Sequence, residues 1–107
     1  MIGDAVKYQL VVQWPASSMK DYDAMVEIED ALIENLGSKS EVDGHDAGSG
    51  EVNIFIRTND PKKTFNEVKA ILESRNMWAD VRVAYRDVSK SEYAILWPTH
   101  LTKFKIA

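Results

Sequence analysis

Hydrophobic residues along this 107-residue chain change their spacing in an order that few folds accommodate. Apolar residues alternate with polar ones, as in a β-strand, in four segments: residues 6–14, 40–43 (weakly), 52–57 and 78–87. They recur every three or four positions, as on one face of a helix, in residues 18–36 and 61–75. The order strand, helix, strand, strand, helix, strand predicts an α+β, ferredoxin-like βαββαβ fold, with a four-stranded antiparallel sheet and both helices on one face.

Local signals mark the ends of both helices. Ser18 and Asp21 have the spacing of a capping box, with Asp in place of the usual Glu, and Gly37 suits a left-handed position after the first helix. The run Asn59–Pro61 predicts a capped helix start with proline at the first helical position. Asn76 is a candidate C-cap of the second helix.

The length fits one domain. We expect residues 1–87 to form the ferredoxin-like unit and residues 88–107 to form a C-terminal extension. That extension is rich in apolar side chains, including the run Tyr93–Pro98, Phe104 and Ile106. It is too apolar to extend freely into water, so the sequence predicts that it packs on the same domain.

Charge is distributed unevenly around a net value of −4. Residues 1–50 carry three lysines and ten acidic residues, a net charge of −7, whereas residues 51–107 carry ten Lys or Arg and seven acidic residues, a net charge of +3. The first helix concentrates acidic side chains on its polar face, at Asp23, Glu27, Asp30 and Glu34. This ridge is either a solvated face or a docking surface for a cationic protein partner.

Composition excludes several classes of function. The chain has no cysteine, which removes disulfides, thiolate metal sites and thiol nucleophiles. It has no run of about 18 apolar residues and no visible signal peptide, so we expect no membrane span and a cytoplasmic location.

The most unusual segment is Gly44–Gly50, which we interpret as a long hairpin loop. His45 oriented by a carboxylate could act as an acid or base, and Asp43, His45 and Asp46 could bind a divalent metal. The alternative is a purely structural hairpin, because the segment matches neither the P-loop nor the dinucleotide-binding motif. The candidate ligand-binding residues are Asp43, Gly44, His45, Asp46, Gly48, Ser49, Gly50 and Glu51.

The sheet face opposite the helices is expected to be mixed and basic, with candidate residues Phe55, Arg57, Arg82 and Arg86. An aromatic residue there resembles the platform of RNA-binding sheets in position only, since the paired aromatics of that module are missing. We therefore expect Phe55 to be covered by the C-terminal extension or by a second copy of the chain, and nucleic-acid binding is not expected.

Several segments together resemble a family of small uncharacterised bacterial proteins. The resemblance rests on Asp21–Asp23 with Glu29 and Asp30 in the first helix, on Val42–Asp46, on Gly48–Glu51 and Asn53–Phe55, and on Tyr93 followed by Leu96–Pro98. It covers most of the chain and implies no activity, because no function is established for that family.

These features favour a non-enzymatic protein-binding or regulatory module, with an immunity-type protein as one form of it. The alternative is a small-ligand, phosphate or metal-dependent activity at Gly44–Gly50, using His45 and Asp46. We assign no catalytic residue, metal or cofactor, and a homodimer through the open sheet face is a further alternative.

Overall fold

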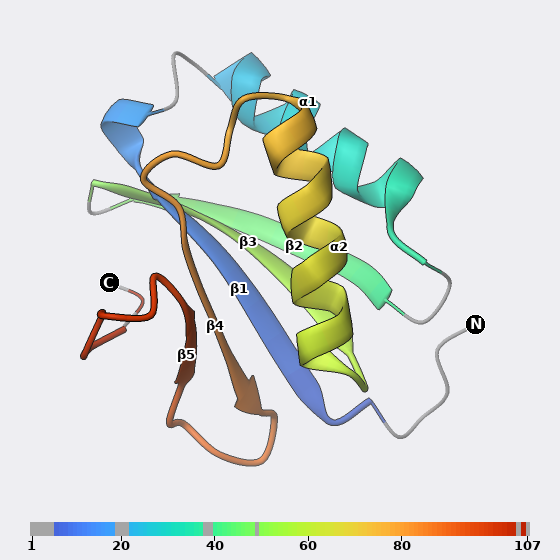
Figure 1. Ribbon diagram of the computed structural model, residues 1–107, viewed down its shortest axis with the longest axis vertical. Coiled ribbons are helices and arrows are strands. Elements are labelled where there is room, and N and C mark those ends of the chain that lie inside the picture. The colour runs from blue at the N-terminus through green and yellow to red at the C-terminus, as the bar shows by residue number, and fades with distance from the viewer. Residues whose placement is uncertain (1–5, 19–21, 38–39, 49, 105, 107) are drawn as a thin grey trace.

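The computed structural model describes residues 6–18, 22–37, 40–48, 50–104 and 106. Its elements are β1 (Tyr8–Pro15), the short 3-10 helix η1 (Ala16–Ser18), α1 (Tyr22–Asn35), β2 (Ser40–Gly48), β3 (Glu51–Thr58), α2 (Pro61–Ser74), β4 (Arg82–Asp87) and β5 (Ala94–Trp97) (Figure 1). The fold is thus α+β, as the spacing of hydrophobic residues predicts. No helix of the described residues is long and apolar enough to cross a membrane.

The strands form one antiparallel sheet in the order β2-β3-β1-β4-β5. The prediction of four strands is therefore wrong, because residues 94–97 of the expected extension add a fifth strand beside β4. β5 has only four residues, and its register with β4 shifts between Val83 and Ala84. A strand this short and irregular shows little alternation, so its pairing depends on the available edge of β4.

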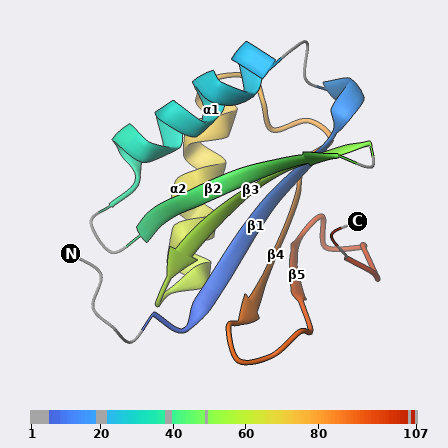
Figure 2. The same cartoon turned by 180° about the vertical axis from the view of Figure 1, so that it is seen from behind.

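Both helices pack against the same face of the sheet, and Figure 1 shows them in front of the strands. The core between these two layers consists of Leu10, Val12, Trp14, Met25, Ile28, Leu32, Val52, Ile54, Ile56, Val68, Leu72, Val81 and Val83. Trp14 is completely buried there, and its indole Nε1 donates a hydrogen bond to the Met77 carbonyl at 3.0 Å. The other sheet face, which we call the open face, is turned toward the viewer in Figure 2.

The predicted start of α2 is confirmed, whereas its C-cap is Arg75, and the predicted Asn76 is the residue after it. Asp60 is the N-cap, its side chain accepts a hydrogen bond from the Lys63 N–H, and Pro61 opens the helix. Asn76 has a φ of 58°, and the turn ends in two hydrogen bonds, Asn76 N–H to Glu73 O and Met77 N–H to Leu72 O. This is the Schellman pattern.

The signals predicted at the ends of α1 are not confirmed. Gly37 is not in the left-handed region, so the prediction of a glycine C-cap is wrong. A Cβ at Gly37 would lie 3.3 Å from the Glu67 carboxylate, so the close approach of α2 is the steric constraint at this position. Asp21 and the Ser18 side chain lie outside the described residues, and so does the predicted capping box.

The interpretation of Gly44–Gly50 as a long loop is wrong. β2 continues to Gly48, which pairs with Glu51 of β3, so the hairpin is closed tightly at the left-handed Gly50, whose φ is 82°. Gly44 has a φ of 123° and lies where the register shifts between Val42 and Gly44. The glycines therefore serve a β-bulge and a tight turn within a strand pair.

Candidate functional site

The first candidate surface is acidic and is formed by α1 and β2. The α1 ridge Asp23, Glu27, Asp30 and Glu34 is exposed along its whole length. β2 contacts α1 and adds three further exposed acidic residues. We call the combined set the acidic face: Asp23, Glu27, Asp30, Glu34, Glu41, Asp43 and Asp46.

His45 connects the two elements of this face. Its Nδ1 lies 3.0 and 3.2 Å from the two carboxylate oxygens of Glu29 on α1. The expected grouping of His45 with Asp46 does not form, because successive residues of a strand point to opposite faces. Register places His45 opposite the buried Ile54 and Asp46 opposite Asn53 of the open face.

β2 also forms one border of the sheet. It pairs with β3 on one side, and no strand of the described chain pairs with its other side. A strand at a sheet border offers backbone N–H and C=O groups to an added strand. Glu41, Asp43 and Asp46 therefore lie along a strand at the border of the sheet.

The second candidate surface is the open face, and it is less open than the sequence predicts. Val11 and Ala84 are completely buried at its centre, although both helices lie on the other side of the sheet. Gln13 and Asn53 are also buried there, and the Gln13 Nε2 donates a hydrogen bond to the Asn53 Oδ1 at 3.0 Å. Phe55 is half-buried, whereas Arg57 is exposed.

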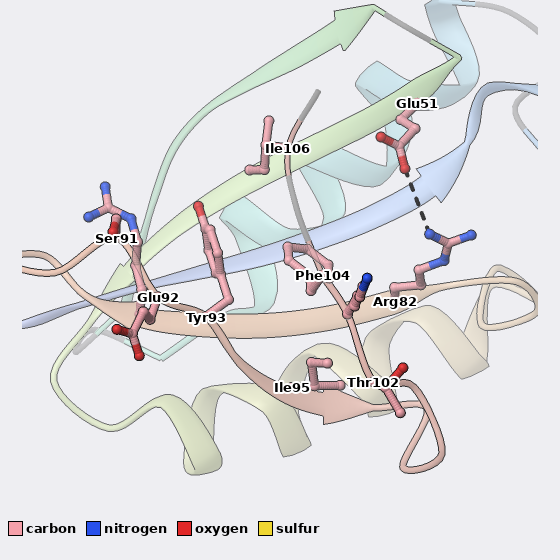
Figure 3. Close-up of a pocket in the computed structure, with 11 residues that line it drawn as sticks. Glu51, Arg82, Ser91, Glu92, Tyr93, Ile95, Thr102, Phe104 and Ile106 are labelled. Atoms are coloured by element: carbon pink, nitrogen blue, oxygen red, sulfur yellow. Dashed lines mark ion pairs between the residues drawn. The ribbon is translucent and has the colours of Figure 1, made fainter.

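The C-terminal segment, defined as residues 98–104 and 106, accounts for part of this covering. Figure 3 shows Tyr93, Phe104 and Ile106 in front of the open face, and the Tyr93 and Phe104 rings lie 5.1 Å apart. Between this segment and the sheet lies a cavity of about 1070 Å³. It is lined by Glu51, Arg82, Arg86, Ser91, Glu92, Tyr93, Ile95, Thr102, Lys103, Phe104 and Ile106.

The two candidate arginines of β4 have different surroundings. Arg86 donates to Gln9 Oε1 at 3.0 Å and to the carbonyls of Val88 and Lys90 at 3.2 and 2.8 Å, which fixes the connection between β4 and β5. Arg82 forms an ion pair with Glu51, with 3.8 Å between Nη1 and Oε2.

The structure places Glu51 apart from the other candidate residues of the glycine segment. It lines the cavity and forms the ion pair with Arg82. The sequence predicts Tyr93 and Phe104 only as apolar residues that pack on the domain, and no sequence signal indicates that their rings meet. Ser49 lies outside the described residues.

Comparison of the chain with protein-family models, with curated proteins and with solved structures gave no match. Within the described residues, no group of three or more His, Asp or Glu side chains is gathered closely enough to hold a metal ion.

Proposed function

We propose that the protein is a non-enzymatic binding module whose acidic face captures a cationic segment of a partner protein. The observation that carries the proposal is the coincidence of exposed carboxylates with an available strand edge. The segment would add to β2 as an extra strand, and its Lys or Arg side chains would lie near the carboxylates on both sides of that strand. Such strand addition gives affinity through the backbone and specificity through side chains.

Register supports this arrangement of charges. Glu41 and Asp46 project toward the open-face side of β2, since they pair with Arg57 and Asn53. The helix α1 lies on the other side of the same strand, and its Glu29 carboxylate contacts His45 of β2. A peptide strand also alternates its side chains, so basic residues on one of its faces would meet Glu41 and Asp46, and those on the other face would lie on the side of α1.

The energetics favour fast, salt-sensitive association. One exposed ion pair contributes only about 0.2–1 kcal/mol. Several carboxylates of one sign raise the association rate, and salt screens their effect. Affinity must then come mainly from the backbone hydrogen bonds of the added strand.

A titration with two model peptides tests the proposal. One peptide repeats the pattern Lys-Lys-Val-Val, which places lysines on both faces of a strand, and the second carries the same charge but has proline in place of valine, which removes half of the N–H donors. We expect the first peptide to shift the NMR resonances of β2 amides, and the second to bind at least several-fold more weakly. Equal binding of both, or shifts centred elsewhere on the protein, would contradict strand addition.

A matched pair of variants tests the charge contribution. Glu34 and Glu73 are each exposed and each the second-last residue of a 14-residue helix, but only Glu34 belongs to the acidic face. Glu34→Lys should weaken binding of the lysine–valine peptide by about three- to tenfold and reduce its salt dependence. Glu73→Lys makes the same change in net charge and should leave the affinity nearly unchanged, so equal effects of both variants would argue against a local docking surface.

The proposal extends to the fold and the location. The strand order β2-β3-β1-β4, with two helices on one face, supports a ferredoxin-like unit to which β5 is added. The chain has no cysteine and so needs no oxidising compartment, which is compatible with a cytoplasmic location.

A further inference from the structure

The cavity over the open face is separate from the acidic face and needs its own explanation. Its walls come from β3, β4 and β5, from the connection between β4 and β5, and from the C-terminal segment, and they include charged, hydroxyl and aromatic side chains. Its volume of about 1070 Å³ slightly exceeds the usual range for small-molecule sites, and the cavity is open to solvent. Seven of its eleven lining residues are polar or charged and four are apolar or aromatic, so the lining suits a ligand that carries both charged and apolar groups.

One end of the cavity presents two opposite charges side by side. The Arg82 Nη1 and Glu51 Oε2 lie 3.8 Å apart, which is within ion-pair range but too long for a hydrogen bond. The two side chains retain 43% and 22% of their exposure. Within the described part of the chain no hydrogen bond holds the Arg82 guanidinium, so its donors can reorient toward a ligand. Arg86, held by three hydrogen bonds, does not have this freedom.

Beside these charges lies an aromatic wall. In the view of Figure 3, Phe104 lies between Tyr93 and Arg82, with Glu51 facing the arginine. The Phe104 and Tyr93 rings are tilted by 55° to each other and both are half-buried. A flat ring placed against Phe104 would therefore lie in the same cavity as both charged groups.

We propose that this cavity binds a small zwitterion with an aromatic ring, namely a free aromatic amino acid. The ligand carboxylate pairs with Arg82, its ammonium group pairs with Glu51, and its ring packs on Phe104 and Tyr93. In an α-amino acid both charged groups are attached to one carbon, so their partners must also be neighbours, as Arg82 and Glu51 are. This site does not depend on the proposed function of the acidic face.

The charge pair argues against simpler ligands. An aromatic carboxylate without an amino group would bring a second negative charge next to Glu51, and an aromatic amine would bring a second positive charge next to Arg82. A zwitterion satisfies both groups and replaces a loose ion pair with charge-assisted hydrogen bonds.

A binding experiment on the full chain distinguishes these cases. Phenylalanine, tyrosine and tryptophan are titrated by NMR and calorimetry, together with phenylpropionate, phenylethylamine and alanine. We expect saturable binding of at least one aromatic amino acid with a Kd of about 1 mM or lower, and at least tenfold weaker binding of the three analogues. Lack of saturation by all three amino acids at about 10 mM, or equal binding of phenylpropionate, would overturn the proposal.

Three variants locate the site. Arg82→Gln and Glu51→Gln should each weaken amino-acid binding by about tenfold, because each removes one charge-assisted contact. Arg57→Gln is the matched control, because Arg57 is exposed on the same sheet face but does not line the cavity. Circular dichroism establishes that the variants are folded, and a loss for Arg57→Gln equal to that for Arg82→Gln would contradict the assigned site.

Discussion

Asp87 shows how one side chain organises the turn that leads to β5. Its Oδ1 accepts hydrogen bonds from the Ser89 hydroxyl at 2.6 Å and from the Ser89 backbone N–H at 2.9 Å. The Lys90 N–H also donates to the Asp87 carbonyl at 2.9 Å. The bond from the Ser89 hydroxyl is the main reason that the pKa of Asp87 lies below its usual value, and the backbone bond lowers it further.

This lowered pKa predicts a pH-dependent contribution to stability. A carboxyl with a lower pKa in the folded state favours folding above its unfolded pKa of about 3.9, and this advantage is lost as the pH falls through the folded pKa. The stability difference between the wild type and Asp87→Asn should therefore be larger at neutral pH than at about pH 3. Urea unfolding at both pH values measures it, and a difference independent of pH would contradict the assignment.

The serine provides a control for the same prediction. Ser89→Ala removes the hydroxyl donor and retains the backbone N–H, so the pKa of Asp87 should rise toward its usual value. An NMR titration of the Asp87 carboxyl carbon measures the change directly, and an unchanged pKa would show that another group causes the shift.

At the level of elements, the end of α2 depends on a left-handed residue. Asn76 adopts a φ of 58° and lets the Met77 N–H reach the Leu72 carbonyl. Asn76→Ala should destabilise the protein by about 1 kcal/mol, because a Cβ without a local hydrogen-bonding side chain disfavours this conformation. Asn76→Gly should be neutral or slightly stabilising. Urea unfolding measures both variants, and equal destabilisation by alanine and glycine would mean that the asparagine side chain, not the backbone conformation, matters.

The sequence predicts those elements whose ends are determined by neighbouring residues. The bounds of α2 are encoded by neighbouring residues, from Asp60 and Pro61 at its start to Asn76 after its end. The extent of β2 could not be predicted in this way, because Gly44 and Gly48 are typical of loops and belong to a strand only through pairing with β3. β5 likewise depends on β4.

At the level of the whole molecule, the two candidate surfaces differ in how far apart their residues lie in sequence. The α1 ridge could be predicted because one helix period gathers Asp23, Glu27, Asp30 and Glu34 on one face. The cavity could not be predicted from the sequence, because its lining brings Glu51 and Arg82 together with residues as distant in sequence as Ile106. The contact of His45 with Glu29 could not be predicted either, because it requires the packing of α1 on β2.

Removing residues 99–107 tests how the C-terminal segment contributes to the covering of the open face. The core between helices and sheet contains none of these residues, so the shortened chain should keep its secondary structure. Loss of the half-buried Phe104 and Ile106 should lower the unfolding free energy by about 2–3 kcal/mol. Urea unfolding measures this loss.

The same truncation should also expose apolar surface around Val11 and Ala84, which are completely buried in the intact chain. A sheet face of this kind that is freed from its cover binds apolar dyes and self-associates. We therefore expect higher fluorescence of an added naphthalene-sulfonate dye and a concentration-dependent sedimentation coefficient. Phe104→Ala, which removes one ring and keeps the backbone, should give a smaller change in both. A truncated chain with the same sedimentation behaviour and dye fluorescence as the intact chain would mean that the face is closed by the β4–β5 connection alone, and that Phe104 and Ile106 contribute little to its covering.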